Sequence, residues 1–204
     1  MYERCKAVAR VINTGTGENI GTGFLMKGSD LFKEWGDLPV FITNSHVISD
    51  NPADNAPMCS GDGSAEFTRL DTRPKVELGE IIFSSPREEL DVTILRINPP
   101  AGVSMLKPLY YPPVLPNDGQ TPQRIYVIGH PGGRELEVTL YDNSLIAYPQ
   151  SRYVHYRSPT EGGHSGSPVF TREWKAMAVH HRARPELQVN EGVLFESIRN
   201  GIHI

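Results

Sequence analysis

The feature that most constrains this fold is a series of about a dozen short apolar runs, rich in β-branched residues and separated by Gly, Pro, Asn or Asp. Runs of this length suit strands and are too short for ordinary helices. The turns between them draw on 19 glycines and 17 prolines. The sequence therefore predicts an all-β barrel or sandwich with strands at 5–12, 20–26, 39–43, 78–83, 91–97, 124–130, 136–141, 144–148, 152–157, 167–170, 176–181 and 192–195.

The region richest in proline is expected to be a surface crossover. Seven prolines lie between 99 and 122, and proline cannot donate to the ladder of a central strand. We expect a single domain over 1–204, made of an N-terminal β half at 1–98, this crossover at 99–122 and a C-terminal β half at 123–204. A short helix is expected only at 195–201, where Gly201 provides a stop.

Charge and cysteine content exclude several classes of function. A net charge of -4 disfavours a surface that binds nucleic acid. The two cysteines, Cys5 and Cys59, cannot form a disulfide framework, which allows a reducing compartment. No apolar run approaches the roughly 18 residues of a membrane span, and the first residues do not resemble a signal peptide. We therefore expect a cytoplasmic protein with no membrane partner and no nucleic-acid partner.

Polar residues that could act in catalysis lie at the ends of three apolar runs. His46 lies at the end of one run, in FITNSHVI. Asp91 lies at the start of another, in LDVTIL, and Ser165 lies just before a third, in EGGHSGSPVF. A serine hydroxyl is a poor nucleophile at neutral pH unless an imidazole takes its proton and a carboxylate orients that imidazole. The glycines around Ser165 permit a tight turn that exposes its hydroxyl. The combination predicts nucleophilic catalysis, although each residue taken singly has a purely structural interpretation.

These segments resemble those of the chymotrypsin-like (trypsin-fold) serine peptidases, both in their amino-acid motifs and in the order of the motifs along the chain. The matching pieces are GTGFL near the start, TNSHVI, LDVTIL and GGHSGSPVF. The resemblance implies two six-stranded antiparallel β-barrels with a short C-terminal helix. It also implies that Ser165 is the nucleophile, His46 the general base and then acid, and Asp91 the orienting carboxylate. The N–H groups of Gly163 and Ser165 would form the oxyanion hole, and the substrate would be a polypeptide.

The sequence departs from the secreted digestive members in ways that place it nearer the disulfide-poor branch. Val47 follows the histidine where those enzymes carry a cysteine, and His164 precedes the nucleophile where the zymogen-activated members carry an aspartate. Activation by N-terminal cleavage in their manner is therefore not expected. The sequence is closer to HtrA-type peptidases and to glutamyl endopeptidases, whose serine motif reads GNSGSPVF. Some members of this branch are effector domains of larger proteins, so regulatory domains or partner proteins are expected as well.

The resemblance also suggests a substrate preference. Glutamyl endopeptidases carry a Thr five residues before the nucleophile and a His fifteen after it, and this sequence has Thr160 and His180 at those offsets. A hydroxyl and an imidazole N–H are suitable donors to a carboxylate or carboxamide oxygen. We therefore expect cleavage after Glu, and less efficiently after Asp or Gln. The plain alternative is that Thr160 is a loop residue and His180 a strand residue.

Two alternative functions remain open at this stage. The chain could be a catalytically inactive trypsin-fold module that binds peptides, or an unrelated β-barrel in which the three motifs coincide. The seven histidines include no HExxH motif and no Cys–His pairing of zinc-site type, so no metal and no cofactor are expected.

Overall fold

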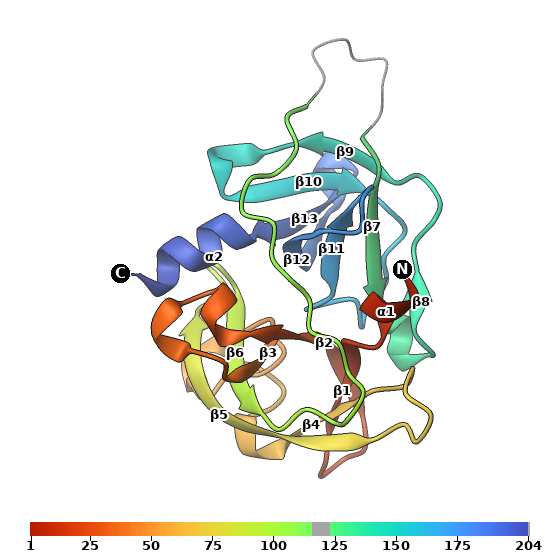
Figure 1. Cartoon of the computed structure of the whole chain (residues 1–204). Helices are drawn as coiled ribbons and strands as arrows, with labels where there is room; N and C mark the ends of the chain where they lie inside the picture. Colours follow the sequence, from red (N-terminus) through yellow and green to blue (C-terminus); the bar gives the residue numbers. More distant parts are fainter. Residues whose placement is uncertain (116–122, 204) are drawn as a thin grey trace.

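The computed structural model describes residues 1–115 and 123–203, which form two β lobes stacked on one another (Figure 1). The first lobe is a closed antiparallel barrel in the order β1-β2-β3-β6-β5-β4. Its strands are β1 (Val8–Asn13), β2 (Asn19–Lys27), β3 (Pro39–Thr43), β4 (Gly63–Glu66), β5 (Lys75–Ser85) and β6 (Val92–Ile97). Antiparallel pairing of β1 with β4 closes the barrel and removes both free edges.

The second lobe is a seven-stranded antiparallel sheet in the order β8-β7-β11-β12-β13-β10-β9. Its strands are β7 (Ile125–Gly129), β8 (Glu137–Val138), β9 (Ser144–Ala147), β10 (Tyr153–Arg157), β11 (Pro168–Thr171), β12 (Ala176–Arg184) and β13 (Val189–Leu194). The expected all-β architecture is confirmed. This lobe has seven strands rather than six because the two-residue β8 adds one beside β7, and an isolated bridge between Arg124 and Ser144 curls the sheet toward closure.

Two helices accompany the strands. The four-residue α1 (Tyr2–Cys5) precedes β1, and α2 (Phe195–Ile202) follows β13 directly. In Figure 1, α2 lies beside the junction of the two lobes. The Phe195 ring meets Phe24 edge-on at 6.1 Å between centroids, which ties the end of the chain to the first barrel. No helix in the described ranges is long and apolar enough to cross a membrane.

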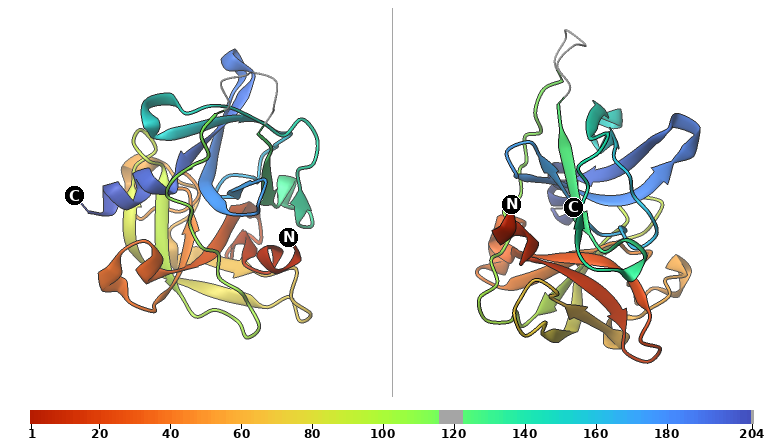
Figure 2. Two further views of the ribbon diagram at one scale, coloured as in Figure 1. Left: turned by 45° about the horizontal axis from the view of Figure 1, so that its top comes forward. Right: turned by 90° about the vertical axis from the view of Figure 1, so that its right-hand side faces the viewer.

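The segment between the lobes runs along both of them. Leu106 N donates to Leu25 O at 2.9 Å, and Leu109 N donates to Ala176 O at 2.6 Å. Part of the proline-rich crossover expected at 99–122 lies outside the described residues, so the division of the chain at 99 and 122 stays a prediction. The two further views in Figure 2 show the described part of the segment passing from one lobe to the other.

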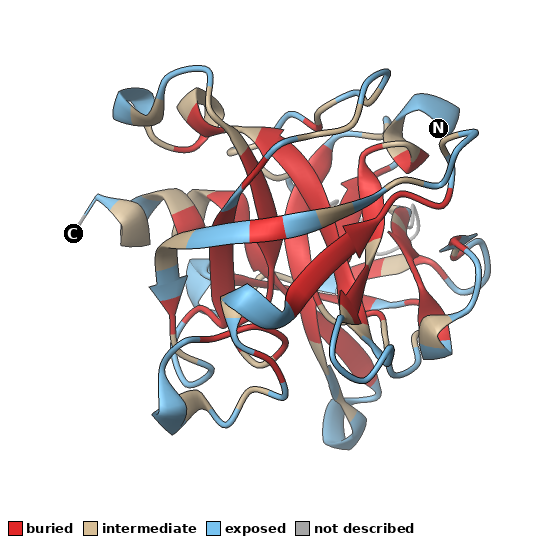
Figure 3. Cartoon of the chain, turned by 90° about the horizontal axis from the view of Figure 1, so that it is seen from below, coloured by how far each residue is buried: buried red, intermediate tan, exposed pale blue. Residues whose placement is uncertain are grey.

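Apolar side chains fill each lobe and continue across the junction. One buried cluster combines barrel residues such as Phe24 and Phe41 with Phe170 and Val179 of the second lobe. A smaller cluster, which includes Tyr156 and Met177, fills the interior of the second sheet. Figure 3 shows the buried strands at the centre and the exposed loops around them. A shared core of this kind fixes one lobe relative to the other, which a site built from both requires.

Candidate active site

His46, Asp91 and Ser165 come together at the junction of the lobes. His46 follows β3, Asp91 directly precedes β6, and Ser165 lies in the turn before β11. The His46 Nδ1 atom lies 2.7 Å from Asp91 Oδ2, and its Nε2 atom lies 2.8 Å from Ser165 Oγ. Because a carboxylate can only accept, Nδ1 carries the ring hydrogen and Nε2 is free to accept the hydroxyl proton. The arrangement can therefore move a proton from the hydroxyl to the imidazole.

The backbone of Asp91 is held in an unusual conformation. Asp91 is buried and has φ of 51°, in the left-handed region that costs a non-glycine residue free energy. Its N–H donates to Pro86 O at 3.0 Å, and Asn44 Nδ2 donates to its carbonyl oxygen at 2.8 Å. These bonds from the β3 and β5 ends fix the direction of the carboxylate.

Four donors surround the Asp91 carboxylate. Ser45 Oγ donates to Oδ1 at 2.9 Å, and the His46 backbone N–H donates to the same oxygen at 3.1 Å. His46 Nδ1 and, at 3.3 Å, His181 Nδ1 face Oδ2. Burial alone would raise the pKa of the Asp91 carboxyl, but the hydrogen bonds from His181 and His46 outweigh it and hold that pKa well below its usual value. The carboxylate is thus ionised at neutral pH.

The turn around Ser165 needs glycine on both sides. Gly163 has φ of +94° and Gly166 has φ of +84°, both in the region that favours glycine. A Cβ atom at Gly166 would lie 2.0 Å from the carbonyl oxygen of Thr22, because β2 passes directly beside the turn. Thr22 also binds the turn itself, since its N–H donates to Ser165 O at 2.8 Å and its Oγ1 donates to Gly163 O at 2.7 Å.

The backbone N–H groups expected to form the oxyanion hole are those of Gly163 and Ser165. Within residues 1–115 and 123–203, neither group donates to a protein acceptor. Both residues are only partly buried. One of these two N–H groups belongs to the nucleophile itself and the other to the residue two positions before it. Together they can bind a developing oxyanion.

Replacing Gly163 with alanine should lower kcat by about 10²- to 10³-fold, as expected when one oxyanion donor is lost. The added Cβ would lie 2.4 Å from the carbonyl oxygen of His130, so the peptide must move away from its present position. Steady-state kinetics on a peptide substrate would measure this, with Gly162→Ala as the matched control because a Cβ at Gly162 meets nothing within 4 Å. Equal losses in the two variants would contradict the assignment.

His180 lies on β12 and Thr160 on the loop before the nucleophile, and no hydrogen bond joins them in the described part of the chain. His180 is buried, and its Nδ1 atom lies 2.6 Å from the hydroxyl of Tyr156 instead. Burial, helped by neighbouring histidines, holds the pKa of His180 well below its usual value, so the ring is neutral. The Tyr156 hydroxyl has no other acceptor among the described residues, so it donates to Nδ1 and leaves the ring hydrogen on Nε2.

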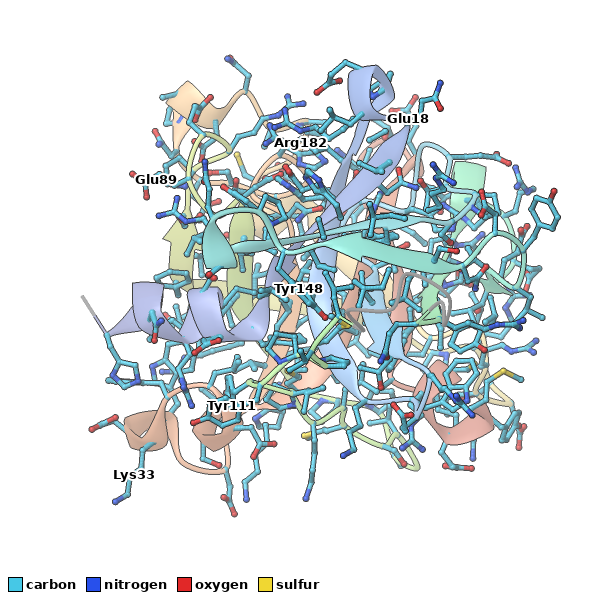
Figure 4. All side chains as sticks on the ribbon, turned by 90° about the horizontal axis from the view of Figure 1, so that it is seen from above. Glu18, Lys33, Glu89, Tyr111, Tyr148 and Arg182 are labelled. Carbon is cyan, nitrogen blue, oxygen red and sulfur yellow. The ribbon has the colours of Figure 1, made fainter. Side chains whose placement is uncertain are left out.

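Three polar residues behind the site were not connected with Asp91 by the sequence patterns. His181 contacts Asp91, Glu191 of β13 contacts His181, and Arg182 binds Glu191 through Nε at 2.7 Å. Figure 4 labels Arg182 near the hairpin formed by β12 and β13. A usable signal was present, because Glu191 directly precedes the apolar run at 192–195, and a charge needs partners when it is buried.

Neither cysteine lies in a cluster with metal-ligand chemistry. Cys5 is buried and Cys59 is exposed, and both are free thiols. Burial raises the pKa of the Cys5 thiol, which disfavours the nucleophilic thiolate. Within the part of the chain that the structure describes, no group of three His, Cys, Asp or Glu side chains is arranged to hold a metal ion.

Comparisons with curated proteins find relatives of much greater length. A glutamyl endopeptidase of Staphylococcus aureus (strain MRSA252) is 29% identical over 115 residues, which cover 55% of this chain and 32% of that protein. The uncharacterized protein y4fB of Sinorhizobium fredii is 28% identical over an alignment of 204 residues. The alignment covers 92% of this chain and 29% of that protein. The chain therefore spans about a third of the length of the curated relatives it matches.

Solved structures and a family model agree on the fold. The Rv3671c protease of M. tuberculosis in its inactive form aligns with a TM-score of 0.66 at 17% identity, covering 98% of this chain and 89% of that one. A serine endoprotease from Yersinia pestis aligns with a TM-score of 0.64 at 18% identity, covering 98% of this chain and 68% of that one. The family model for the trypsin-like peptidase domain matches residues 21–179. The chain therefore belongs to the trypsin-like peptidases and carries the fold of a serine endopeptidase.

Proposed function

We propose that this protein hydrolyses peptide bonds through His46, Asp91 and Ser165, and that it cleaves after Glu, with Gln and Asp as poorer residues at that position. The observation that carries the first part is the continuous chain of contacts at 2.7 and 2.8 Å from carboxylate to imidazole to hydroxyl. A structural role alone gives no reason for the hydroxyl of a partly buried serine to face a histidine.

The reaction follows from the positions of these groups. Ser165 Oγ attacks the scissile carbonyl while His46 Nε2 takes its proton, and Asp91 stabilises the imidazolium that forms. The N–H groups of Gly163 and Ser165 bind the oxygen that becomes negative. His46 then gives its proton to the departing amine, which leaves an acyl group on Ser165. A water molecule, deprotonated by His46, attacks this ester and releases the second product.

The preference for Glu depends on His180. Its neutral ring has one hydrogen, on Nε2, and that nitrogen has no partner among the described residues. A neutral N–H binds a carboxylate oxygen more strongly than an amide oxygen, because the bond is charge-assisted. The 29% identity to a glutamyl endopeptidase supports the same preference. A protonated His180 is not required for it.

Digestion of a peptide library, followed by sequencing of the new ends, tests the preference. We expect Glu before the cut most often, and a digest with no acidic or amide preference would discard the pocket while leaving the hydrolase proposal intact. Fluorophosphonate labelling tests the hydrolase proposal separately. Failure of the unaltered protein to react, together with no turnover of the library, would favour the inactive peptide-binding module.

Replacing His180 with leucine should lower kcat/KM for Glu substrates by about 10- to 100-fold, the value of one hydrogen bond to a charged group. The reaction of Ser165 with a fluorophosphonate should persist, because that reagent needs no contact in the pocket. A matched His203→Leu variant, changed at an exposed histidine near the C-terminus, should retain the Glu preference. Assays with paired Glu and Leu substrates measure the effect, and an equal loss on both would argue against a specificity role.

Two expectations from the sequence are separate from the proposed reaction. A cytoplasmic location and the involvement of regulatory domains or partner proteins stay predictions from the sequence. Mass analysis of the native gene product would test whether the domain belongs to a longer chain.

A further inference from the structure

His181 occupies a position that the proposed reaction does not use. Its side chain is 1% exposed and lies between two carboxylates. The Nδ1 atom faces Asp91 Oδ2 at 3.3 Å, and the Nε2 atom faces Glu191 Oε1 at 3.0 Å. A neutral imidazole has only one N–H, so it would aim a lone pair at one of these anions. Only the imidazolium satisfies both contacts.

We infer that His181 is a positioning residue that is held as an imidazolium between Asp91 and Glu191, and that it shares the Asp91 carboxylate with His46. The inference rests on the proposed roles of His46 and Asp91. It goes further because it assigns a second cation to the orienting carboxylate. Asp91 then divides its negative charge between two rings, and less of it stabilises the imidazolium of His46.

Glu191 is the group that makes this possible. It is 1% exposed and receives His181 and Arg182 on Oε1, while His155 Nε2 approaches Oε2 at 2.6 Å and Arg184 Nε approaches it at 3.5 Å. Burial alone would raise the pKa of Glu191, but hydrogen bonds from His181, His155 and Arg182 hold it well below its usual value. Glu191 is therefore a fixed anion behind His181.

The other groups around His181 have opposing effects on its charge. The ring of Tyr153 on β10 stacks on His181 with centroids 5.6 Å apart and planes 3° apart, an arrangement that favours a cation. The cations that share Glu191 oppose a charge on His181, while His180 beside it is neutral. The titratable or charged groups that face His181 or its carboxylate partners are thus Asp91, Glu191, Tyr153, His155, Arg182 and Arg184, with His46 beyond Asp91. The two direct contacts with carboxylates outweigh the repulsion from these cations and favour the imidazolium form of His181.

The sign of the effect on catalysis follows from this charge. In the unaltered protein, the His181 cation repels a second positive charge on His46. Removing the His181 charge removes this repulsion. The acid limb of the pH profile of kcat/KM, which reports protonation of the free base, should then move to higher pH. A shift of roughly one pH unit is the size expected for a unit charge several ångströms away in a partly buried site.

The kinetic test compares His181→Asn, Glu191→Gln and the double variant with the unaltered protein. Asparagine keeps a donor toward Asp91 but removes the charge, and glutamine removes the anion that keeps His181 protonated. We expect both single variants to move the acid limb upward by about one pH unit, and the double variant to move it no further. His203→Asn, an exposed substitution of the same type, should leave the limb in place. A limb that does not move in folded variants would overturn the inference.

A second measurement needs no turnover. In Ser165→Ala protein labelled with ¹⁵N, long-range ¹H–¹⁵N spectra report the protonation of each imidazole nitrogen. We expect both His181 nitrogens to carry hydrogen at pH 7. A singly protonated His181 would overturn the inference even if the substitutions unfold the chain. If the unaltered protein fails to react with a fluorophosphonate while His181 is doubly protonated, the proposed function fails and the charge assignment stands.

Discussion

Replacing Ser165 with alanine should lower kcat by about a millionfold, the loss found when a serine nucleophile of this type is removed. Without the Oγ atom, no acyl-enzyme can form, and His46 Nε2 loses the group from which it takes a proton at 2.8 Å. The variant should also fail to react with a fluorophosphonate. Because the hydroxyl is at the surface of the junction and packs little apolar area, the midpoint of thermal unfolding should change little.

Ser167→Ala is the matched control for this experiment. Ser167 lies two residues further along the same turn, is fully buried, and its hydroxyl has no hydrogen-bond partner in the described part of the chain. Removing an unpaired buried hydroxyl is neutral or stabilising. This variant should therefore label and turn over normally. Substantial turnover by the Ser165→Ala protein would transfer the chemistry to another group and end the assignment.

Replacing Asp91 with asparagine should lower kcat by about 10⁴-fold. Ser45 Oγ and the His46 backbone N–H both donate to Oδ1, so the amide oxygen of the new side chain must take that position. The amide NH₂ group then faces His46 Nδ1 at the site of Oδ2. Donation from the amide makes Nδ1 the acceptor and moves the ring hydrogen to Nε2, where it blocks proton transfer from Ser165.

Kinetics and imidazole NMR together measure this prediction. The position of the ring hydrogen in Asp91→Asn protein should change from Nδ1 to Nε2. Asp142→Asn, a change at an exposed aspartate, serves as the control and should retain full activity. Activity within tenfold of the unaltered protein, with the ring hydrogen still on Nδ1, would show that Asp91 does not set the tautomer.

Much of the fold could be predicted because periodic apolar runs and turn residues report strands directly. The run PVFIT at 39–43 coincides with β3, and the short helix expected at 195–201 is observed as α2. The four residues of β4 were missed because GSAE contains no β-branched or large apolar residue. That strand is formed by pairing with β1 and β5, which no local pattern in the segment indicates.

The opposite error occurred at 136–141, where an alternating run favoured a full strand. Only Glu137–Val138 forms a strand, with one further backbone hydrogen bond from Thr139 N to Val127 O at 3.0 Å, while Leu140 and Tyr141 are exposed. Periodicity shows which residues could alternate between two faces, but not whether a neighbouring strand extends far enough to bond them.

The candidate site divides in a similar way between what sequence patterns can and cannot reveal. His46, Asp91 and Ser165 were identified because each lies in a motif with its own glycines or flanking strand. Tyr156 was missed because its contact with His180 joins β10 to β12 across β13, and Tyr156 does not stand out in its own segment. Likewise, His181 acquires its environment only when β13 brings Glu191 beside it.

The close passage of β2 beside the nucleophile turn has a mechanical consequence. Thr22 of one lobe bonds the backbone of Gly163 and Ser165 in the other, while the proton acceptor comes from the first lobe as well. Separating the two lobes by the width of one water molecule would leave each β sheet intact but would break these contacts and stop hydrolysis.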